Sequence, residues 1–189
     1  MNNYKKNYYE YLKKRSLVGL LYRRYILYPS ICRHLNGFVL DIGCGIGDFL
    51  KFRTNTVGVD INEETVMHCR ELGLDAQVMI ENVLPFESKK FDAIVLDNVL
   101  EHIIDPTLLF IEISRVLKPK GTLLVGVPGI KGYKRDPDHK IFYDLEKLMK
   151  LMNQNNFSYV THFYKPITFI NLSILISQHS LYSIFDLGN

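Results

Sequence analysis

The stretch VLDIGCGIGDF, residues 39–49, restricts the fold more than any other part of this sequence. A short apolar run ends there beside Asp41, and glycine then occupies positions 43, 45 and 47. The length of the run and its glycine stop indicate a buried β-strand followed by a tight turn. Such a bare turn lets the backbone bend sharply and lets a ligand approach the main chain closely. We therefore expect a ligand beyond the end of the first strand.

Strand-like and helix-like segments alternate along the rest of the chain. Apolar or alternating runs predict strands over residues 37–43, 56–62, 76–80, 91–98, 122–128 and 157–164. Helical spacing and capping residues predict helices over residues 48–53, 62–73, 106–118 and 144–156. This alternation is typical of the α/β class, with a doubly wound, mostly parallel sheet and helices on both faces. Ligands of such sheets bind beyond the carboxyl ends of the strands.

Asp60, at the end of the second expected strand, indicates a nucleoside, because a carboxylate there can accept hydrogen bonds from both ribose hydroxyls. The glycines depart from the G-x-G-x-x-G pattern of nicotinamide dinucleotide sites, since Asp48 or Leu50 stands where the third glycine belongs. Asp41 would also repel a pyrophosphate, whereas it would attract an ammonium group. These features favour a ligand that joins an amino acid to a nucleoside, which describes S-adenosylmethionine.

Five segments, in order, carry a resemblance to a known family. They are VLDIGCGIGDFL, VGVDIN, LPFESKKFDAIVLDNVLEHI, EISRVLKPKGTLLVGVPG and DHKIFYDLEKLMKLMNQNNF. Over about residues 37–160 the chain resembles class I S-adenosylmethionine-dependent methyltransferases, and it is similar to the group of quinone-type, sugar and cell-surface-glycan methyltransferases. The resemblance implies a Rossmann-like sheet of seven strands with an antiparallel last strand. It also implies S-adenosyl-L-methionine as cofactor and O-methyl transfer to a small molecule, such as a sugar, a glycan precursor or a quinone-like acceptor.

The resemblance also assigns cofactor contacts to particular residues. It places Asp41, Gly43, Gly45 and Gly47 at the methionine part, Asp60 at the ribose, Ile61 at the adenine face, Glu81 and Asn82 at the adenine edge, and Asp97 beneath the transferable methyl. The sequence departs from the family at Met79, where related sequences often carry an aspartate that accepts from the adenine amino group. A backbone carbonyl or Glu81 is then left to make that contact.

The loop after the fifth expected strand supplies the candidates for the chemistry. His139 is the first candidate catalytic base, with Asp136 or Asp138 to orient its ring. His102 is the second, although capping or supporting its own helix is an equally good interpretation. Three residues of the same loop region are candidates for contacts with an anionic acceptor: Tyr133, Arg135 and Tyr143.

Composition narrows the classes of partner and compartment. The net charge of +3 is too small to indicate a nucleic-acid partner. The three cysteines share no disulfide or zinc-like spacing, and the six histidines lie far apart in sequence, so we expect no metal site. The N-terminus lacks the apolar core of a secretion signal, and no segment is long enough to span a membrane, so we expect a cytoplasmic protein.

We expect residues 1–36 to form an N-terminal helical lid or substrate region over a methyltransferase domain of residues 37–189, all within one globular unit. Helical spacing places one apolar side along Leu17, Leu20, Leu21, Tyr25 and Leu27 or Tyr28. The basic residues of this region have two interpretations: the solvated face of a lid, or a surface for an anionic substrate or for peripheral membrane contact. The tail, residues 166–189, suits a helix and then the last strand.

Two other functions remain open at this point. One is a non-catalytic protein that binds S-adenosylmethionine, and the less favoured one is an NAD-dependent oxidoreductase. The sequence does not indicate an oligomeric state.

Overall fold

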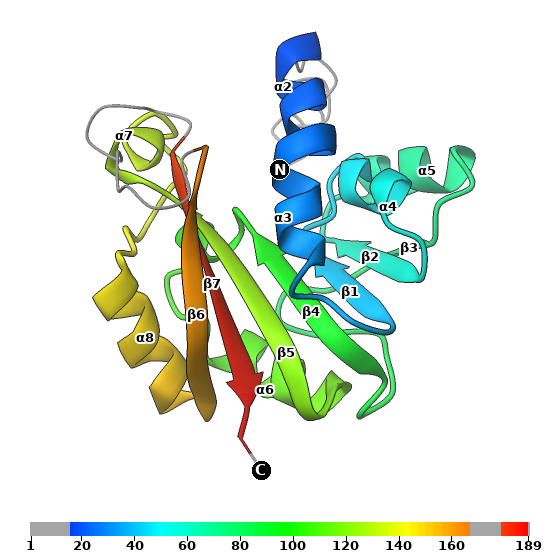
Figure 1. The fold of residues 1–189 in the computed structure, drawn as a ribbon. Coiled ribbons are helices and arrows are strands. Elements are labelled where there is room, and N and C mark those ends of the chain that lie inside the picture. Colours follow the sequence, from blue (N-terminus) through cyan, green and yellow to red (C-terminus); the bar gives the residue numbers. More distant parts are fainter. Residues whose placement is uncertain (1–15, 167–178, 189) are drawn as a thin grey trace.

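A computed structural model describes residues 16–166 and 179–188, and these form a seven-stranded sheet with the order β3-β2-β1-β4-β5-β7-β6 (Figure 1). The strands are β1 (Val39–Ile42), β2 (Thr56–Asp60), β3 (Ala76–Val78), β4 (Phe91–Asp97), β5 (Leu117–Pro128), β6 (Phe157–Lys165) and β7 (Ser180–Leu187). Strands β1 to β5 pair in parallel, and β7 runs antiparallel between β5 and β6. The predicted seven-stranded, mostly parallel sheet with an antiparallel last strand is confirmed.

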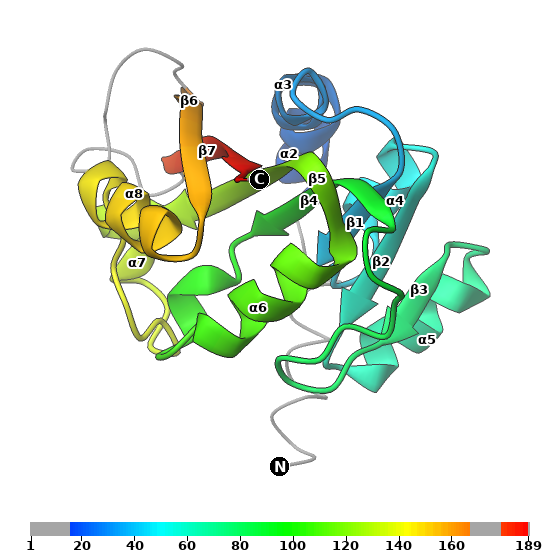
Figure 2. The same cartoon turned by 90° about the horizontal axis from the view of Figure 1, so that it is seen from below.

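Helices lie on both faces of this sheet (Figure 2). They are α2 (Leu17–Tyr22), the π-helical turn η1 (Arg23–Leu27), α3 (Tyr28–Cys32), α4 (Asp48–Phe52), α5 (Glu63–Glu71), the 3-10 turn η2 (Leu100–His102), α6 (Thr107–Val116), α7 (Ile130–Tyr133) and α8 (Leu145–Gln154). No helix among the described residues is both long and apolar enough to cross a bilayer.

The sequence-based helix boundaries hold where a capping residue marks them. Asn62 caps α5 by accepting a hydrogen bond from the N–H of Glu64, and Asp144 caps α8 by accepting one from Lys147. The boundary between α6 and β5 was predicted wrongly, since the helix ends at Val116 and the strand begins at once at Leu117. The chain leaves the helix early because Leu117 pairs with Phe91 of β4.

Alternate residues of the strands contribute to apolar cores on both faces of the sheet, and a smaller cluster includes Val66 and Cys69 of α5. On one face, α6 and α8 bury their apolar sides against the sheet. On the other, α3 and α4 do so. The first core includes Leu40, Ile94, Phe110, Ile113, Leu123, Leu148, Met152 and Phe185. The second includes Leu27, Tyr28, Ile31, Phe49, Val95, Leu124, Phe163 and Tyr182. Because both faces are filled by packing, polar groups gather at the edge formed by the strand ends.

Residues 17–32 of the N-terminal region are helical, and the apolar side expected there is buried only at its C-terminal end. Leu27 and Tyr28 are buried, whereas Leu17 is 71% and Tyr25 68% exposed, and Leu20 and Leu21 are exposed too. The reason is geometric, because α2 extends beyond the sheet edge, whereas α3 and the end of η1 lie over the core (Figure 1). Residues 1–15 and the helix expected before β7, within residues 167–178, lie outside the described residues.

Candidate active site

The glycine turn after β1 is tied to the end of β2 by hydrogen bonds. The N–H groups of Gly43 and Cys44 both donate to the carbonyl of Val59, at 2.8 and 3.0 Å. The N–H of Gly45 donates to Oδ2 of Asp60 at 2.9 Å, and the other carboxylate oxygen, Oδ1, accepts from the N–H of Asn62 at 2.8 Å. Asp60 therefore fixes the turn through its side chain as well as ending β2.

Two of the three glycines are required by their surroundings rather than by a ligand. Gly43 has a φ of +77°, and a Cβ there would overlap the side chain of Val99. Gly47 also has a φ of +77°, and a Cβ there would lie 2.7 Å from Leu74 and 2.9 Å from Sγ of Cys69. Glycine at position 47 thus lets the turn pack closely against α5 and the segment that follows it.

Three carboxylates lie at the ends of neighbouring strands: Asp41 on β1, Asp60 on β2 and Asp97 on β4. Asp41 and Asp60 are only 5% and 6% exposed. Burial raises the pKa of Asp41 well above its usual range, and the charges of Asp97 and Asp60 raise it further. Each of these carboxylates thus makes it harder for Asp41 to ionise, and a cation placed among them would relieve this repulsion.

This concentration of carboxylates fits the charged groups of S-adenosylmethionine, which carries an ammonium and a sulfonium. It does not fit the pyrophosphate of a dinucleotide, whose two negative charges would meet Asp41, Asp60 and Asp97. The oxygens of Asp60 each accept one backbone hydrogen bond, and a carboxylate oxygen can accept a second, so ribose hydroxyls can be added to the existing contacts.

The expected adenine side is more open. Ile61 is 52% exposed, and Glu81 is exposed on a turn in which the N–H of Val83 donates to the carbonyl of Ile80. Asn82 has a φ of +60° in that turn. Met79 is buried in the core at 7% exposure, while its N–H donates to the carbonyl of Asp60. The Met79 side chain therefore packs into the interior and leaves the adenine edge to the turn that follows.

A second polar group forms where η2 meets the loop after α7. Oε1 of Glu101 lies 3.7 Å from Nε2 of His139, and the two side chains are 1% and 9% exposed. Both carboxylate oxygens of Glu101 lack a hydrogen-bond partner among the described residues. Burial raises the pKa of Glu101 to about 8. Two groups that can accept a proton or a cation thus face each other.

The predicted orientation of His139 by a neighbouring acid is not what the structure has. Nδ1 of His139 lies 2.9 Å from the carbonyl oxygen of Tyr133, so this nitrogen is the donor. Asp136 is 3.9 Å from Nε2, beyond hydrogen-bond length, and its Oδ1 accepts from the N–H of Asp138 instead. The carbonyl of Tyr133 therefore sets the tautomer and leaves the Nε2 lone pair facing Glu101.

The structure brings His102 and two of the three expected acceptor residues to this group. The rings of His102 and His139 are 4.7 Å apart, and the ring of Tyr133 stacks on His139 at 5.6 Å. Tyr143 is buried at 4% exposure, and its pKa is raised by burial and by the charge of Glu101. Arg135 is exposed on the same loop.

Sequence reasoning missed three residues of the site. Glu101 stands in the LEHI segment, but its burial depends on the later loop, whose Lys140 and Ile141 donate to its carbonyl. Tyr22 of α2 has its pKa raised to about 12 by burial and by the charge of Asp97. Tyr182 of β7 has its pKa raised by burial and by Asp97. The adjacency of Glu and His at 101–102 was the only local signal for any of them.

The raised pKa of Asp41 predicts pH-dependent binding of S-adenosylhomocysteine, the demethylated product. Asp41 attracts the ligand's ammonium only when it is ionised, so affinity should fall as the pH is lowered. The fall should begin well above pH 4, because about 3.9 is the ordinary pKa of an aspartate. Calorimetric titrations between pH 5 and 8 measure it. Asp41→Asn should bind more weakly and lose this part of the pH dependence; an unchanged profile in that variant would contradict the role of Asp41.

Comparison with known proteins begins with a domain family. Residues 40–125 match the family described as a methyltransferase domain. An uncharacterised protein of Methanocaldococcus jannaschii is 33% identical over 162 residues, which are 82% of this chain and 59% of that protein. A ubiquinone/menaquinone biosynthesis C-methyltransferase of Blochmanniella pennsylvanica is 30% identical over 158 residues, 74% of this chain and 61% of that enzyme. The chain thus spans about 60% of the length of these relatives.

Solved structures agree in fold. A protein of Thermotoga maritima described as an S-adenosylmethionine-dependent methyltransferase, possible histamine N-methyltransferase, superposes with a TM-score of 0.74 at 20% identity, and the match covers 97% of each chain. An S-adenosylmethionine-dependent methyltransferase of Methanosarcina mazei gives a TM-score of 0.66 at 22% identity, covering 85% of this chain and 98% of that one. At these identities, the likeness shows that this chain shares the fold of the two neighbours.

Proposed function

We propose that this chain is a class I S-adenosylmethionine-dependent methyltransferase and that it transfers a methyl group to an oxygen of a small molecule; the match of residues 40–125 to a methyltransferase domain and the shared fold support this. The observation that best supports the proposal is the gathering of Asp41, Asp60 and Asp97 around the glycine turn. Such a site suits a cationic amino acid joined to a nucleoside. The relative from Blochmanniella pennsylvanica, a C-methyltransferase, supports methyl transfer itself.

We assign the cofactor contacts to the edge formed by β1, β2 and β4. Asp60 accepts from the ribose hydroxyls, Asp41 faces the ammonium, and the backbone from Gly43 to Gly47 runs along the methionine part. Ile61 contacts the adenine face, Glu81 and Asn82 the adenine edge, and Asp97 the region beneath the methyl. Bound S-adenosylmethionine supplies a methyl on a sulfonium, which is already a good leaving group. The protein therefore acts mainly by aligning the two reactants, which can supply about 7–11 kcal/mol in well-oriented systems.

We assign the acceptor to the group formed by Glu101, His102 and His139. The acceptor oxygen attacks the methyl carbon, the carbon–sulfur bond breaks with its electron pair left on sulfur, and the hydroxyl proton passes to Nε2 of His139. The lone pair of that nitrogen is available because Nδ1 donates to the carbonyl of Tyr133. His102 is the second candidate for the base.

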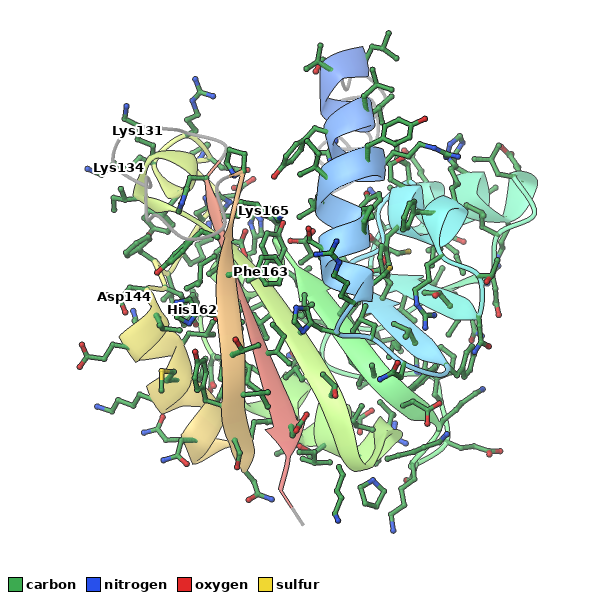
Figure 3. All side chains as sticks on the ribbon, viewed as in Figure 1. Lys131, Lys134, Asp144, His162, Phe163 and Lys165 are labelled. Carbon is green, nitrogen blue, oxygen red and sulfur yellow. The ribbon has the colours of Figure 1, made fainter. Side chains whose placement is uncertain are left out.

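We place an anionic acceptor, such as a phosphorylated sugar or glycan precursor, ahead of a quinone-like ring. Support comes from basic residues near the carboxyl edge of the sheet. Lys131 and Lys134 project outward at α7 (Figure 3), Arg135 follows on the same loop, and Arg24 is exposed near the junction of α2 and α3. Tyr133 and Tyr143 would contact the acceptor's ring. The free thiols of Cys32, Cys44 and Cys69 suit a cytoplasmic location.

Two measurements test the proposal. Isothermal titration should give one saturable site for S-adenosylhomocysteine and no heat with NAD⁺. Incubation with methyl-labelled S-adenosylmethionine and panels of hydroxylated sugars, sugar phosphates and quinols should then label one class. No binding of S-adenosylhomocysteine would overturn the proposal. Binding without label transfer to any acceptor would favour the non-catalytic alternative, and binding of NAD⁺ alone would favour the oxidoreductase.

A further inference from the structure

The group formed by Glu101, His102 and His139 has the composition of a metal-binding site. One ligand atom from each of these side chains lies within 4.8 Å of the other two. Two come from η2, and the third from the loop that follows α7. Two imidazoles and one carboxylate form a ligand set that proteins use for divalent transition metals.

The state of Glu101 is the first independent reason to place a cation there. Its side chain is 1% exposed, and neither carboxylate oxygen has a hydrogen-bond partner among the described residues. A buried polar group without partners is costly, whereas a cation would supply both oxygens with a ligand bond. Nε2 of His139 lies 3.7 Å from Oε1 of Glu101, which is too long for a hydrogen bond.

The second reason is the outer contact of the His139 imidazole. Metal-binding histidines almost always donate the opposite ring N–H to a carbonyl or carboxylate, which fixes the tautomer and aims the free nitrogen. His139 donates from Nδ1 to the carbonyl of Tyr133 at 2.9 Å. The ring of His102 lies against that of His139, with the centroids 4.7 Å apart. His139 thus keeps Nε2 for the centre of the group.

We propose that Glu101, His102 and His139 together bind one divalent transition-metal ion. Zn²⁺ fits the set best, because its catalytic sites combine two histidines and a glutamate with one position left open. Mg²⁺ fits poorly, since it prefers oxygen ligands in an octahedron. His102 is exposed, while Glu101 and the side chain of His139 are nearly covered, so the ion would enter past His102.

This inference deepens the proposed function. Metal binding itself does not depend on that function, but the role of the ion in methyl transfer rests on it. With the ion bound, Nε2 of His139 is a ligand, and the open position would hold the acceptor oxygen. An oxygen on the ion loses its proton to water more readily, because the cation lowers its pKa. In the protein without the ion, the proton of the acceptor hydroxyl passes to Nε2 of His139 instead.

The test uses the untagged full chain, stripped with chelator and titrated with Co²⁺, which reports its ligands through visible absorption, and then with Zn²⁺ in competition. One saturable site is expected. Glu101→Gln and His139→Ala should each weaken binding at least about tenfold, since even residues that only orient ligands cost about 10- to 100-fold when removed. His68→Ala, on α5, is the matched control and should bind as the parent does.

Titration with S-adenosylhomocysteine and far-ultraviolet circular dichroism show that each variant is folded. Saturable Co²⁺ binding lost in both site variants and kept in His68→Ala supports the inference. No saturable binding, or equal binding in all four proteins, overturns it. A chain that binds S-adenosylhomocysteine but no metal refutes only the metal site, whereas one that binds metal but not S-adenosylhomocysteine refutes only the proposed function.

Discussion

Replacing Asp60 with alanine should weaken binding of S-adenosylhomocysteine at least about 100-fold. The carboxylate accepts hydrogen bonds from Gly45 and Asn62 and, in the proposed complex, from the ribose hydroxyls. Hydrogen bonds to a charged group contribute about 1.5–3 kcal/mol each, and about 1.4 kcal/mol corresponds to a tenfold change in affinity. Losing two to the ribose therefore accounts for the effect before any loosening of the glycine turn. Isothermal titration measures it.

Two further variants separate ligand contact from turn geometry. Asp60→Asn keeps one acceptor oxygen and should fall between the parent and the alanine variant. Asp75→Ala removes an exposed acid just before β3 and should bind as the parent does. If Asp60→Ala bound S-adenosylhomocysteine within about threefold of the parent, the assignment of the ribose to this carboxylate would be wrong.

Replacing His139 with alanine should lower turnover about 10²- to 10⁴-fold, the usual contribution of a positioned proton-transfer group. The affinity for S-adenosylhomocysteine should stay the same, because His139 lies in the acceptor part of the site beside Glu101. The loss is expected whether His139 takes the proton or holds an ion. Turnover with the labelled acceptor and calorimetry on the same preparation measure the two quantities.

The control for His139 is His34→Ala, which removes a histidine that stacks on Phe163, in the core on the α3 face. It should keep its turnover. Full turnover in His139→Ala would remove this residue from the chemistry and leave His102 as the candidate base. Loss of cofactor binding together with turnover would instead point to a folding defect.

Much of the fold could be predicted from the sequence because its signals are local. Strand β4 contains the apolar run of residues 93–96, and helices such as α5 and α8 begin with a capping side chain. The glycine turn and Asp60 were also predictable, because both follow directly from strand ends that must meet at one edge of a parallel sheet.

What the sequence could not predict depends on contacts between distant segments. Glu101 and His139 meet only because the loop after α7 folds back, where Lys140 donates to the carbonyl of Glu101. Helical periodicity predicted which apolar residues of α2 share a side, but not that this side is exposed, because periodicity does not tell how far a helix extends past its sheet. Met79 stands where related sequences often carry an aspartate. The structure shows that its side chain is buried in the core, which the sequence did not predict.

The position of β7 between β5 and β6 governs the order in which the sheet can be completed during synthesis. Residues 180–187 emerge from the ribosome after all the other strands, yet both β5 and β6 pair with them. Until then β5 has an open edge and β6 has no partner in the sheet, and unpaired edges invite association with other chains. The half of the sheet that holds β1, β2 and β4 can form earlier. The nascent chain would therefore have the edge proposed to bind the cofactor before β7 completes the sheet.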